Sequence, residues 1–324
     1  SSDLEAFARG GVETLAVTGL VTHLSFGCET EDYGLLKQLA AERISPEEWQ
    51  EALAQGRSYA QAARTILEQR QPAYRRLLTG SNNQLALEYL RALDKEYPSL
   101  RVLPVRRDGT AYNADSLQGP FPSASALRRE LREHGFSESF LSGFPAAVQP
   151  VLHRLAAGFA PVREDVLDDL LLYRLELSSA GRIASLADVS EGLENLICKN
   201  KRAGSFRAIV AAAATKRYSP SRLQRLLWQI LLSDSEVSFA EAKHLKPAYL
   251  RVLGFTEKGR ALLSRMKQTA AVPILPCLEK DTLSHLPAEG RRLLKLDVRA
   301  TDLYELITTG KITDLDYKKA PVKG

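Results

Sequence analysis

The sequence has few cysteines and no long apolar run. Its three cysteines, Cys28, Cys198 and Cys277, are far apart and form no C-x-x-C pair, which argues against a disulfide scaffold or a thiolate metal site and favours a reducing cytoplasm. No apolar stretch approaches the roughly 18 residues that a membrane-spanning helix needs. No signal peptide is evident, and the five histidines show no i,i+4 spacing. We therefore expect a cytoplasmic protein with no membrane partner and no metal site, and no protein partner is evident.

Disorder and coiled coil are also excluded, because 44% hydrophobic and 26% charged residues are typical of globular proteins. A chain of 324 residues is long enough for roughly two domains. The net charge of +5 is modest, but it is distributed unevenly along the chain.

The first part of the chain has an α/β pattern. Alternating apolar residues predict strands over residues 21–27 and 100–107. Predicted helices lie at 3–16, 31–42, from Ser45 (which starts a capping box with Glu48), from about 58, at 82–94 and at 123–134. Two strands are too few for a self-sufficient open sheet, which usually has about four to six. We therefore expect that the chain lacks the beginning of this domain.

From about residue 136 the pattern is almost entirely helical. We expect three parts: residues 1–135 as the end of an ATP-binding domain, 136–290 as a basic helical domain, and 291–324 as a segment that packs back on the body. Within the second part, 205–232 reads as helix, turn and helix. A buried stripe is predicted at Leu223, Leu226, Leu227 and Ile230, with Arg222, Arg225 and Gln229 on the opposite face.

Residues 195–233 contain eight basic residues and no acidic one. This imbalance favours a polyanion such as RNA as partner, although a solvated surface is the alternative. The candidate contacts are seven cations and one tyrosine that could stack on an unpaired base: Lys199, Lys201, Arg202, Lys216, Arg217, Arg222, Arg225 and Tyr218.

Several short segments could bind a nucleotide, and each has a simpler structural interpretation. Gly27 ends a strand, where a ligand can approach the backbone or a turn can begin. Asn82 and Asn83 begin a helix, where one asparagine serves as a cap and the other remains for a ligand. Adjacent strand residues point to opposite faces, so only one of Arg106 and Arg107 can reach a site above the sheet. At the next helix start, Ser123, Ser125 and Arg128 suit either phosphate binding or simple capping.

Taken together, the chain resembles the tRNA(Met) cytidine acetate ligase family of the nucleotidyltransferase superfamily. The resemblance covers nearly the whole chain and rests on the order of "FARGGVETL", "LSFGCETED", "SNNQLALEYLRAL", "SASALRREL", "TKRYSPSRLQRLL", "PAYLRVLGFTEKGRALL" and "LDVRATDLY". It implies a partial Rossmann-like nucleotidyltransferase domain followed by a mainly helical domain. It also implies that ATP, with Mg²⁺, and acetate form an acetyl-adenylate, from which the acetyl group passes to the wobble cytidine of elongator tRNA(Met), giving N4-acetylcytidine.

Carried over by position, the family's ATP contacts fall on Gly27, Asn82 and Arg107, with Ser125 and Arg128 facing the phosphates. No catalytic residue is evident. Cys28 stands where the family usually has serine, and the family's N-terminal "EYNPFHNGH" signature does not occur in this sequence. We therefore expect a truncated member that is inactive alone. The alternatives are a non-catalytic RNA-binding module or a nucleotidyltransferase that acts on a small molecule.

Overall fold

The computed structural model describes residues 2–57, 59–106, 122–158, 161–190, 192–215, 217–234 and 238–324. The chain divides into two compact units, each discontinuous in sequence. Unit 1 comprises Ser1–Leu24, Leu87–Val102 and Val162–Gly324, and unit 2 comprises Ser25–Ala86 and Leu103–Pro161. The division crosses three elements, β1 (His23–Cys28), β2 (Arg101–Arg106) and α6 (Ser81–Glu96).

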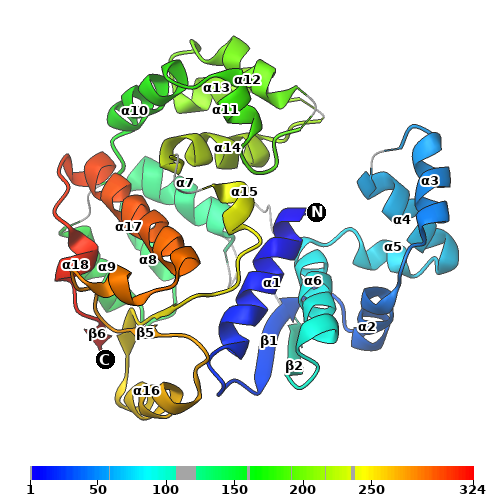
Figure 1. Cartoon of the computed structure of the whole chain (residues 1–324), viewed down its shortest axis with the longest axis horizontal. Helices are drawn as coiled ribbons and strands as arrows, with labels where there is room; N and C mark the ends of the chain where they lie inside the picture. The colour runs from blue at the N-terminus through cyan, green and yellow to red at the C-terminus, as the bar shows by residue number, and fades with distance from the viewer. Residues whose placement is uncertain are drawn as a thin grey trace. The chain divides into compact units, whose positions relative to one another are not determined.

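Strands β1 and β2 form a two-stranded sheet, close to the positions that the sequence predicts. In β1, Leu24, Phe26 and Cys28 are buried and alternate with exposed residues, which is the pattern of a strand with one face against a core. Helix α1 (Ser2–Ala16) packs against the second half of α6, where a Cβ on Gly11 would lie 3.8 Å from the Tyr89 ring. Figure 1 shows α1 and α6 side by side.

Unit 2 contains four helices between β1 and α6: α2 (Tyr33–Ala41), α3 (Pro46–Ala54), α4 (Tyr59–Arg70) and α5 (Tyr74–Leu77). The predicted capping box at α3 is confirmed, because Ser45 Oγ accepts from the Glu48 amide and Glu48 accepts from the Ser45 amide. Ala52, Ala62 and Ile66 form a small core between α3 and α4. The unit also contains α7 (Ala124–His134), α8 (Glu138–Ser142) and α9 (Gln149–Ala156).

Unit 1 is built on the five helices α10 (Glu164–Glu176), α11 (Ala180–Ala184), α12 (Leu193–Asn200), α13 (Phe206–Ala213) and α14 (Pro220–Leu232), which Figure 1 shows gathered together. The predicted helix-turn-helix is confirmed as α13 and α14. The stripe Leu223, Leu226, Leu227 and Ile230 is buried in the main core of this unit. An amphipathic α14 therefore fixes which of its residues face outward.

The rest of unit 1 contains α15 (Phe239–Ala242), α16 (Glu257–Thr269), η1 (Thr282–His285), α17 (Ala288–Thr309) and α18 (Leu315–Lys318). Four strands of two residues each were not predicted. β3 (Leu250–Arg251) pairs in parallel with β5 (Ile274–Leu275), and β4 (Gly254–Phe255) pairs in parallel with β6 (Val322–Lys323). The last residues of the chain are thus hydrogen-bonded to the segment before α16.

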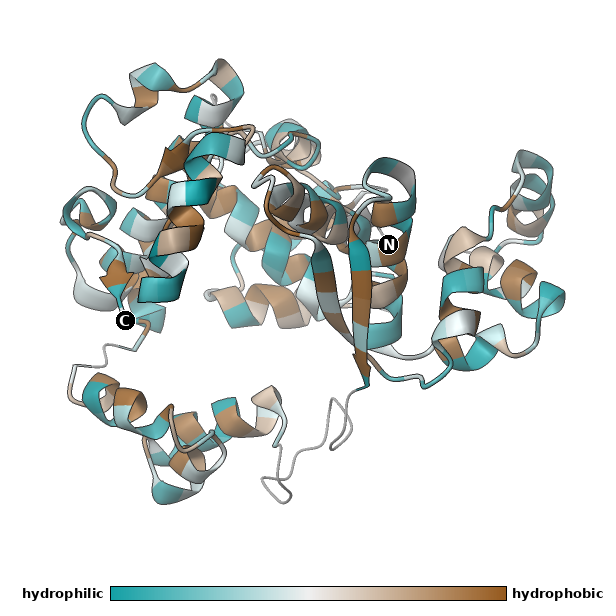
Figure 2. Cartoon of the chain, turned by 90° about the horizontal axis from the view of Figure 1, so that it is seen from below, coloured by the Kyte–Doolittle hydropathy of each residue, from teal (hydrophilic) through white to brown (hydrophobic). Residues whose placement is uncertain are grey.

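Hydropathy alternates along most helices, as Figure 2 shows, so that each has one apolar side to bury. Within the described part of the chain, none of the helices combines the length and the apolar character needed to cross a membrane.

Candidate functional site

The end of β1 is tied to the first turn of α6 through Glu29. The Glu29 carboxylate accepts hydrogen bonds from the backbone N–H of Asn82 at 3.1 Å and from its side-chain amide at 2.9 Å. In return, the Asn83 side-chain oxygen accepts from the Glu29 amide at 2.8 Å. Asn83 is only 3% exposed, whereas Asn82 is half-buried. Neither asparagine caps α6, which begins at Ser81, and Glu29 takes that role.

A cavity of about 620 Å³ lies beside this junction, wholly within unit 2, and is named here the Glu29 cavity. Its polar lining comprises Glu29, Thr30, Glu31, Asp32, Arg76, Asn83 and Arg106. Arg106 pairs with Glu31, and Arg76 pairs with Asp32 at 3.2 Å. Both pairs are well exposed, so each contributes little to stability. The two arginines can therefore exchange a carboxylate for a phosphate at small cost.

Gly27 and Cys28 precede this cavity in the sequence and face opposite sides of β1. Gly27 is exposed, and a Cβ built there would meet nothing within 4 Å, so open space borders the backbone. Cys28 is 2% exposed, and its thiol donates weakly to the Thr30 carbonyl. Burial raises the pKa of this thiol, which makes it a poor nucleophile. A serine at this position could make the same bond, so the cysteine is compatible with the family pattern.

The remaining predicted nucleotide contacts are distributed as follows. Arg107 lies outside the described residues, and its neighbour Arg106 lines the Glu29 cavity. Ser123 is buried and caps α7 by accepting from the Ala126 amide at 3.1 Å. Ser125 and Arg128 are exposed on α7, outside the residues that line the Glu29 cavity.

The predicted RNA-binding cations differ in how far they face solvent. Lys199, Arg202, Arg217 and Arg225 are exposed, and the Arg202 side chain is 85% exposed. Lys201 is half-buried and pairs with Glu176 of α10 at 2.8 Å, while Arg202 approaches the same carboxylate at 4.0 Å. Lys216 lies outside the described residues.

Tyr218 and Arg222 instead face the protein interior. Tyr218 is 6% exposed and its hydroxyl donates to the Ser190 carbonyl, so the ring offers no free face for a base, which corrects the prediction of stacking. Arg222 donates from Nε and Nη2 to the Asp188 carbonyl, from Nη2 to Ser190 Oγ, and lies over the Tyr218 ring. Gln229 bonds the backbone of Ala187. The polar face predicted for α14 is therefore partly internal.

Sequence analysis missed Glu29, Arg76 and Asn83 as parts of the site. Glu29 follows the strand-end glycine directly, so its place beyond the strand was a usable signal. Arg76 belongs to α5, which has only four residues and gives no periodic pattern.

Comparison with known proteins gives one consistent result. The family model described as HIGH Nucleotidyl Transferase matches residues 2–319. The chain is 32% identical to a Clostridium kluyveri protein named tRNA(Met) cytidine acetate ligase, over 99% of this chain and 80% of the relative. A Syntrophomonas wolfei protein of the same name is 31% identical, over 98% and 80%.

Solved structures agree with these relatives. The apo crystal structure of Thermotoga maritima TmcAL superposes with a TM-score of 0.87 at 28% identity, covering 99% of this chain and 81% of that one. The same protein bound with alpha-thio ATP gives a TM-score of 0.84 at 28% identity, covering 99% and 80%. The expected nucleotidyltransferase-like fold, with its small sheet and mainly helical remainder, is therefore confirmed, and the chain belongs to the tRNA(Met) cytidine acetate ligase family of HIGH nucleotidyl transferases.

Proposed function

We propose that this protein is an ATP-dependent ligase that transfers the acetyl group of acetate to the wobble cytidine of elongator tRNA(Met). The observation that carries the proposal is the match to ligases of that name along nearly the whole chain, together with a relative solved with an ATP analogue. An RNA-binding module without catalysis would not require a cavity of nucleotide size in unit 2.

The reaction needs ATP because acetate has no good leaving group. A carboxylate oxygen of acetate attacks the α-phosphorus of ATP and pyrophosphate leaves, giving acetyl-adenylate. The exocyclic amine of cytidine then attacks the acetyl carbon, AMP leaves, and the amine loses a proton. Positioning and electrostatic stabilisation suit such chemistry, since charge moves between oxygens that the protein can hold by hydrogen bonds.

The residues of unit 2 fit ATP in three respects. The Glu29 cavity, at about 620 Å³, lies within the usual size range of small-molecule sites. Arg76 and Arg106 would bind phosphates in exchange for Asp32 and Glu31, with which they form exposed pairs. The open space at Gly27 would let the nucleotide approach the backbone of β1.

Magnesium would accompany ATP rather than occupy a site of its own. No group of three or more His, Cys, Asp or Glu residues suited to a metal ion occurs in the described part of the chain. Mg²⁺ is commonly held by one or two carboxylates together with substrate phosphates. Glu31 and Asp32, which line the Glu29 cavity, are the carboxylates nearest to hand for that role.

The RNA would lie on the exposed cations of unit 1, which are Lys199, Arg202, Arg217 and Arg225. Phosphate contacts by lysine and arginine release counterions, so binding by this surface would weaken as salt rises. Arg222 would contribute indirectly, by holding the segment 188–190.

The test is transfer of radiolabelled acetate to elongator tRNA(Met) in the presence of ATP and magnesium. One arm uses this chain, a second uses the Thermotoga maritima relative as positive control, and a third joins a relative's glycine/histidine segment ahead of residue 1. Label on tRNA in the first or third arm is the expected result. Label in the second arm alone, with tRNA still bound by this chain, would overturn the ligase proposal in favour of an RNA-binding protein.

A further inference from the structure

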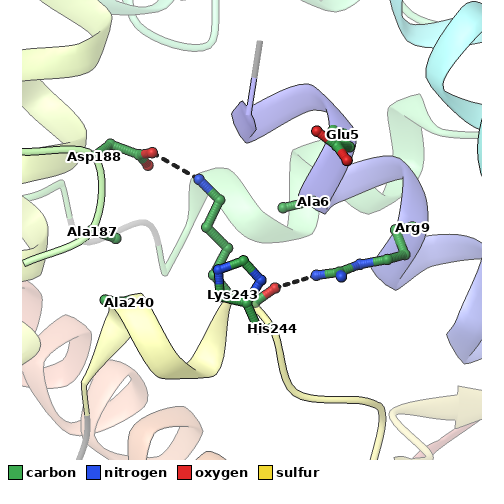
Figure 3. A pocket seen from close by; sticks show the side chains of 8 residues that line it. All are labelled: Glu5, Ala6, Arg9, Ala187, Asp188, Ala240, Lys243 and His244. Atoms are coloured by element: carbon green, nitrogen blue, oxygen red, sulfur yellow. Dashed lines mark hydrogen bonds and ion pairs between the residues drawn. The ribbon is translucent and has the colours of Figure 1, made fainter. Parts of the chain in front are cut away.

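A second cavity, named here the Arg9 cavity, lies within unit 1 and belongs to none of the sites above. It has a volume of about 290 Å³ and is bounded by α1, by residues 187–188 and by the end of α15 (Figure 3). Ala6, Ala187 and Ala240 contribute only methyl groups to its lining, so three different segments leave room for a flat group.

The Arg9 guanidinium contains an unused donor in this cavity. Its Nη2 donates to the Lys243 carbonyl at 2.5 Å. Its Nε is buried and has no hydrogen-bond partner among the described residues. A buried donor without an acceptor costs free energy, so an acceptor from outside the chain would stabilise this arrangement.

The charges of the cavity disfavour a phosphate as that acceptor. Lys243 pairs with Asp188 at 2.7 Å, and their side chains are only 15% and 24% exposed, so the two charges offset each other. Glu5, one turn before Arg9 on α1, adds a carboxylate to the lining, as Figure 3 shows. A doubly charged group would meet both carboxylates, whereas a neutral ring with donors and acceptors on its edge would meet complementary groups.

The wall formed by Asp188 is fixed in place. Asp188 has a φ of +63°, a left-handed conformation that is uncommon for a residue other than glycine. Its carboxylate is held by Lys243 and its carbonyl by Arg222 of α14. A wall that is ordered before binding reduces the conformational entropy lost when a ligand enters.

We propose that the Arg9 cavity receives one unpaired base of an RNA substrate, with Arg9 Nε donating to the base and Glu5 accepting from it. The proposal rests on the proposed function, because it takes tRNA as the ligand of unit 1. The contact between Asp188 and Arg222 links the cavity to α14, which also carries the exposed Arg225. RNA-binding proteins commonly read unstacked bases in such pockets while cations hold the backbone.

The test combines cavity-filling variants with abasic RNA. Ala6→Leu and Ala240→Leu fill the cavity from α1 and from α15 without changing charge, and Ala54→Leu, on the exposed end of α3, is the matched control. Affinity is measured for an elongator tRNA(Met) transcript and for a series in which each unpaired nucleotide in turn is made abasic. We expect each filling variant to weaken binding roughly tenfold, which is a typical contribution of one bound base, while Ala54→Leu has no effect.

One abasic position should weaken binding by wild type to a similar extent and have little further effect on Ala6→Leu, because both changes remove the same contact. Since the two variants lie on different elements, unfolding of one leaves the comparison measurable with the other. Wild-type affinity in both filling variants, or losses that add at every abasic position, would overturn the proposal. If wild type labels tRNA with acetate and these results are negative, only the Arg9 cavity loses its role. If wild type binds no tRNA, the proposed function fails first.

Discussion

The Glu29 carboxylate caps helix α6 by binding both the backbone N–H and the side-chain amide of Asn82, at 3.1 and 2.9 Å. A carboxylate at a helix N-terminus satisfies an otherwise unpaired N–H and interacts favourably with the helix dipole. The same contact orients the Asn82 amide. Glu29 is therefore a positioning residue for the proposed ATP contact at Asn82.

Glu29→Gln should weaken ATP binding, because the neutral side chain accepts more weakly from Asn82 and lets its amide turn. We expect a several-fold increase in the ATP Kd with tRNA affinity unchanged, and a loss of about 1 kcal/mol in the free energy of unfolding, typical of a weakened cap. Isothermal titration with ATP and thermal unfolding measure the two effects.

Glu51→Gln serves as the control for Glu29→Gln, because Glu51 is an exposed residue of α3. It removes the same charge from unit 2 without touching α6. Equal ATP affinities in wild type and Glu29→Gln, with Asn82→Ala impaired, would show that Asn82 acts without help from Glu29.

Gly80→Ala should displace the Glu29 carboxylate. A Cβ on Gly80 would lie 1.9 Å from one Glu29 oxygen, and this carboxylate can move only by giving up its bonds to Asn82. The expected result is a loss of ATP affinity at least as large as that of Glu29→Gln. Gly10→Ala, in α1, meets nothing within 4 Å and should instead stabilise the protein by up to about 1 kcal/mol through helix propensity. Normal ATP binding by Gly80→Ala would contradict the proposed role of the contact.

Local patterns predicted the elements but not their long-range contacts. Strand alternation at residues 21–27 and the capping box at Ser45 depend on near neighbours, and both are present in the structure. The capping of α6 depends on Glu29, which lies 53 residues before Asn82, and no periodicity records such a pair. The short strands β3 to β6 were missed because two residues are too few to show an alternation.

The basic stretch illustrates a different limit. The sequence places Arg222 and Arg225 on the polar face of one helix, yet only Arg225 is exposed. The reason is the segment 188–190, whose backbone approaches α14 and accepts from Arg222. Charge counting alone cannot distinguish an arginine that binds a partner from one that holds a loop.

Arg225→Ala should weaken tRNA binding without changing the unfolding temperature. If Arg225 neutralises one phosphate, the slope of log affinity against log salt should become shallower by about 0.9, or somewhat less on single-stranded RNA. Filter binding over a salt series measures this slope. An unchanged affinity and slope would remove Arg225 from the RNA surface.

Arg222→Ala should lower the unfolding temperature, because it leaves the Asp188 carbonyl without its arginine donor. Buried acceptors that lose a charged donor typically cost about 1–3 kcal/mol. Arg222→Lys should rescue little of this, since one ammonium cannot replace the two-pronged contact. A wild-type unfolding temperature combined with a shallower salt slope would instead mark Arg222 as a phosphate contact.

Glu305 should make the stability of the C-terminal segment depend on pH. Hydrogen bonds from the Thr313 hydroxyl and amide hold the pKa of this buried carboxyl of α17 below its usual value. A lowered folded-state pKa means that the ionised form favours folding, so its contribution is complete above the unfolded-state pKa of about 4.3 and is lost as the pH falls through the folded-state value.

Glu305→Gln should therefore lower the unfolding temperature at pH 7, and the difference from wild type should narrow once the pH falls below about 4.3. Thermal unfolding of both proteins between pH 3 and pH 7 measures that difference. Glu257→Gln, at a side chain that is 81% exposed, should shift the unfolding temperature little at any pH, because exposed ion pairs contribute little. A gap between wild type and Glu305→Gln that stays constant over this range would show that Thr313 binds the carboxyl equally well in its protonated form.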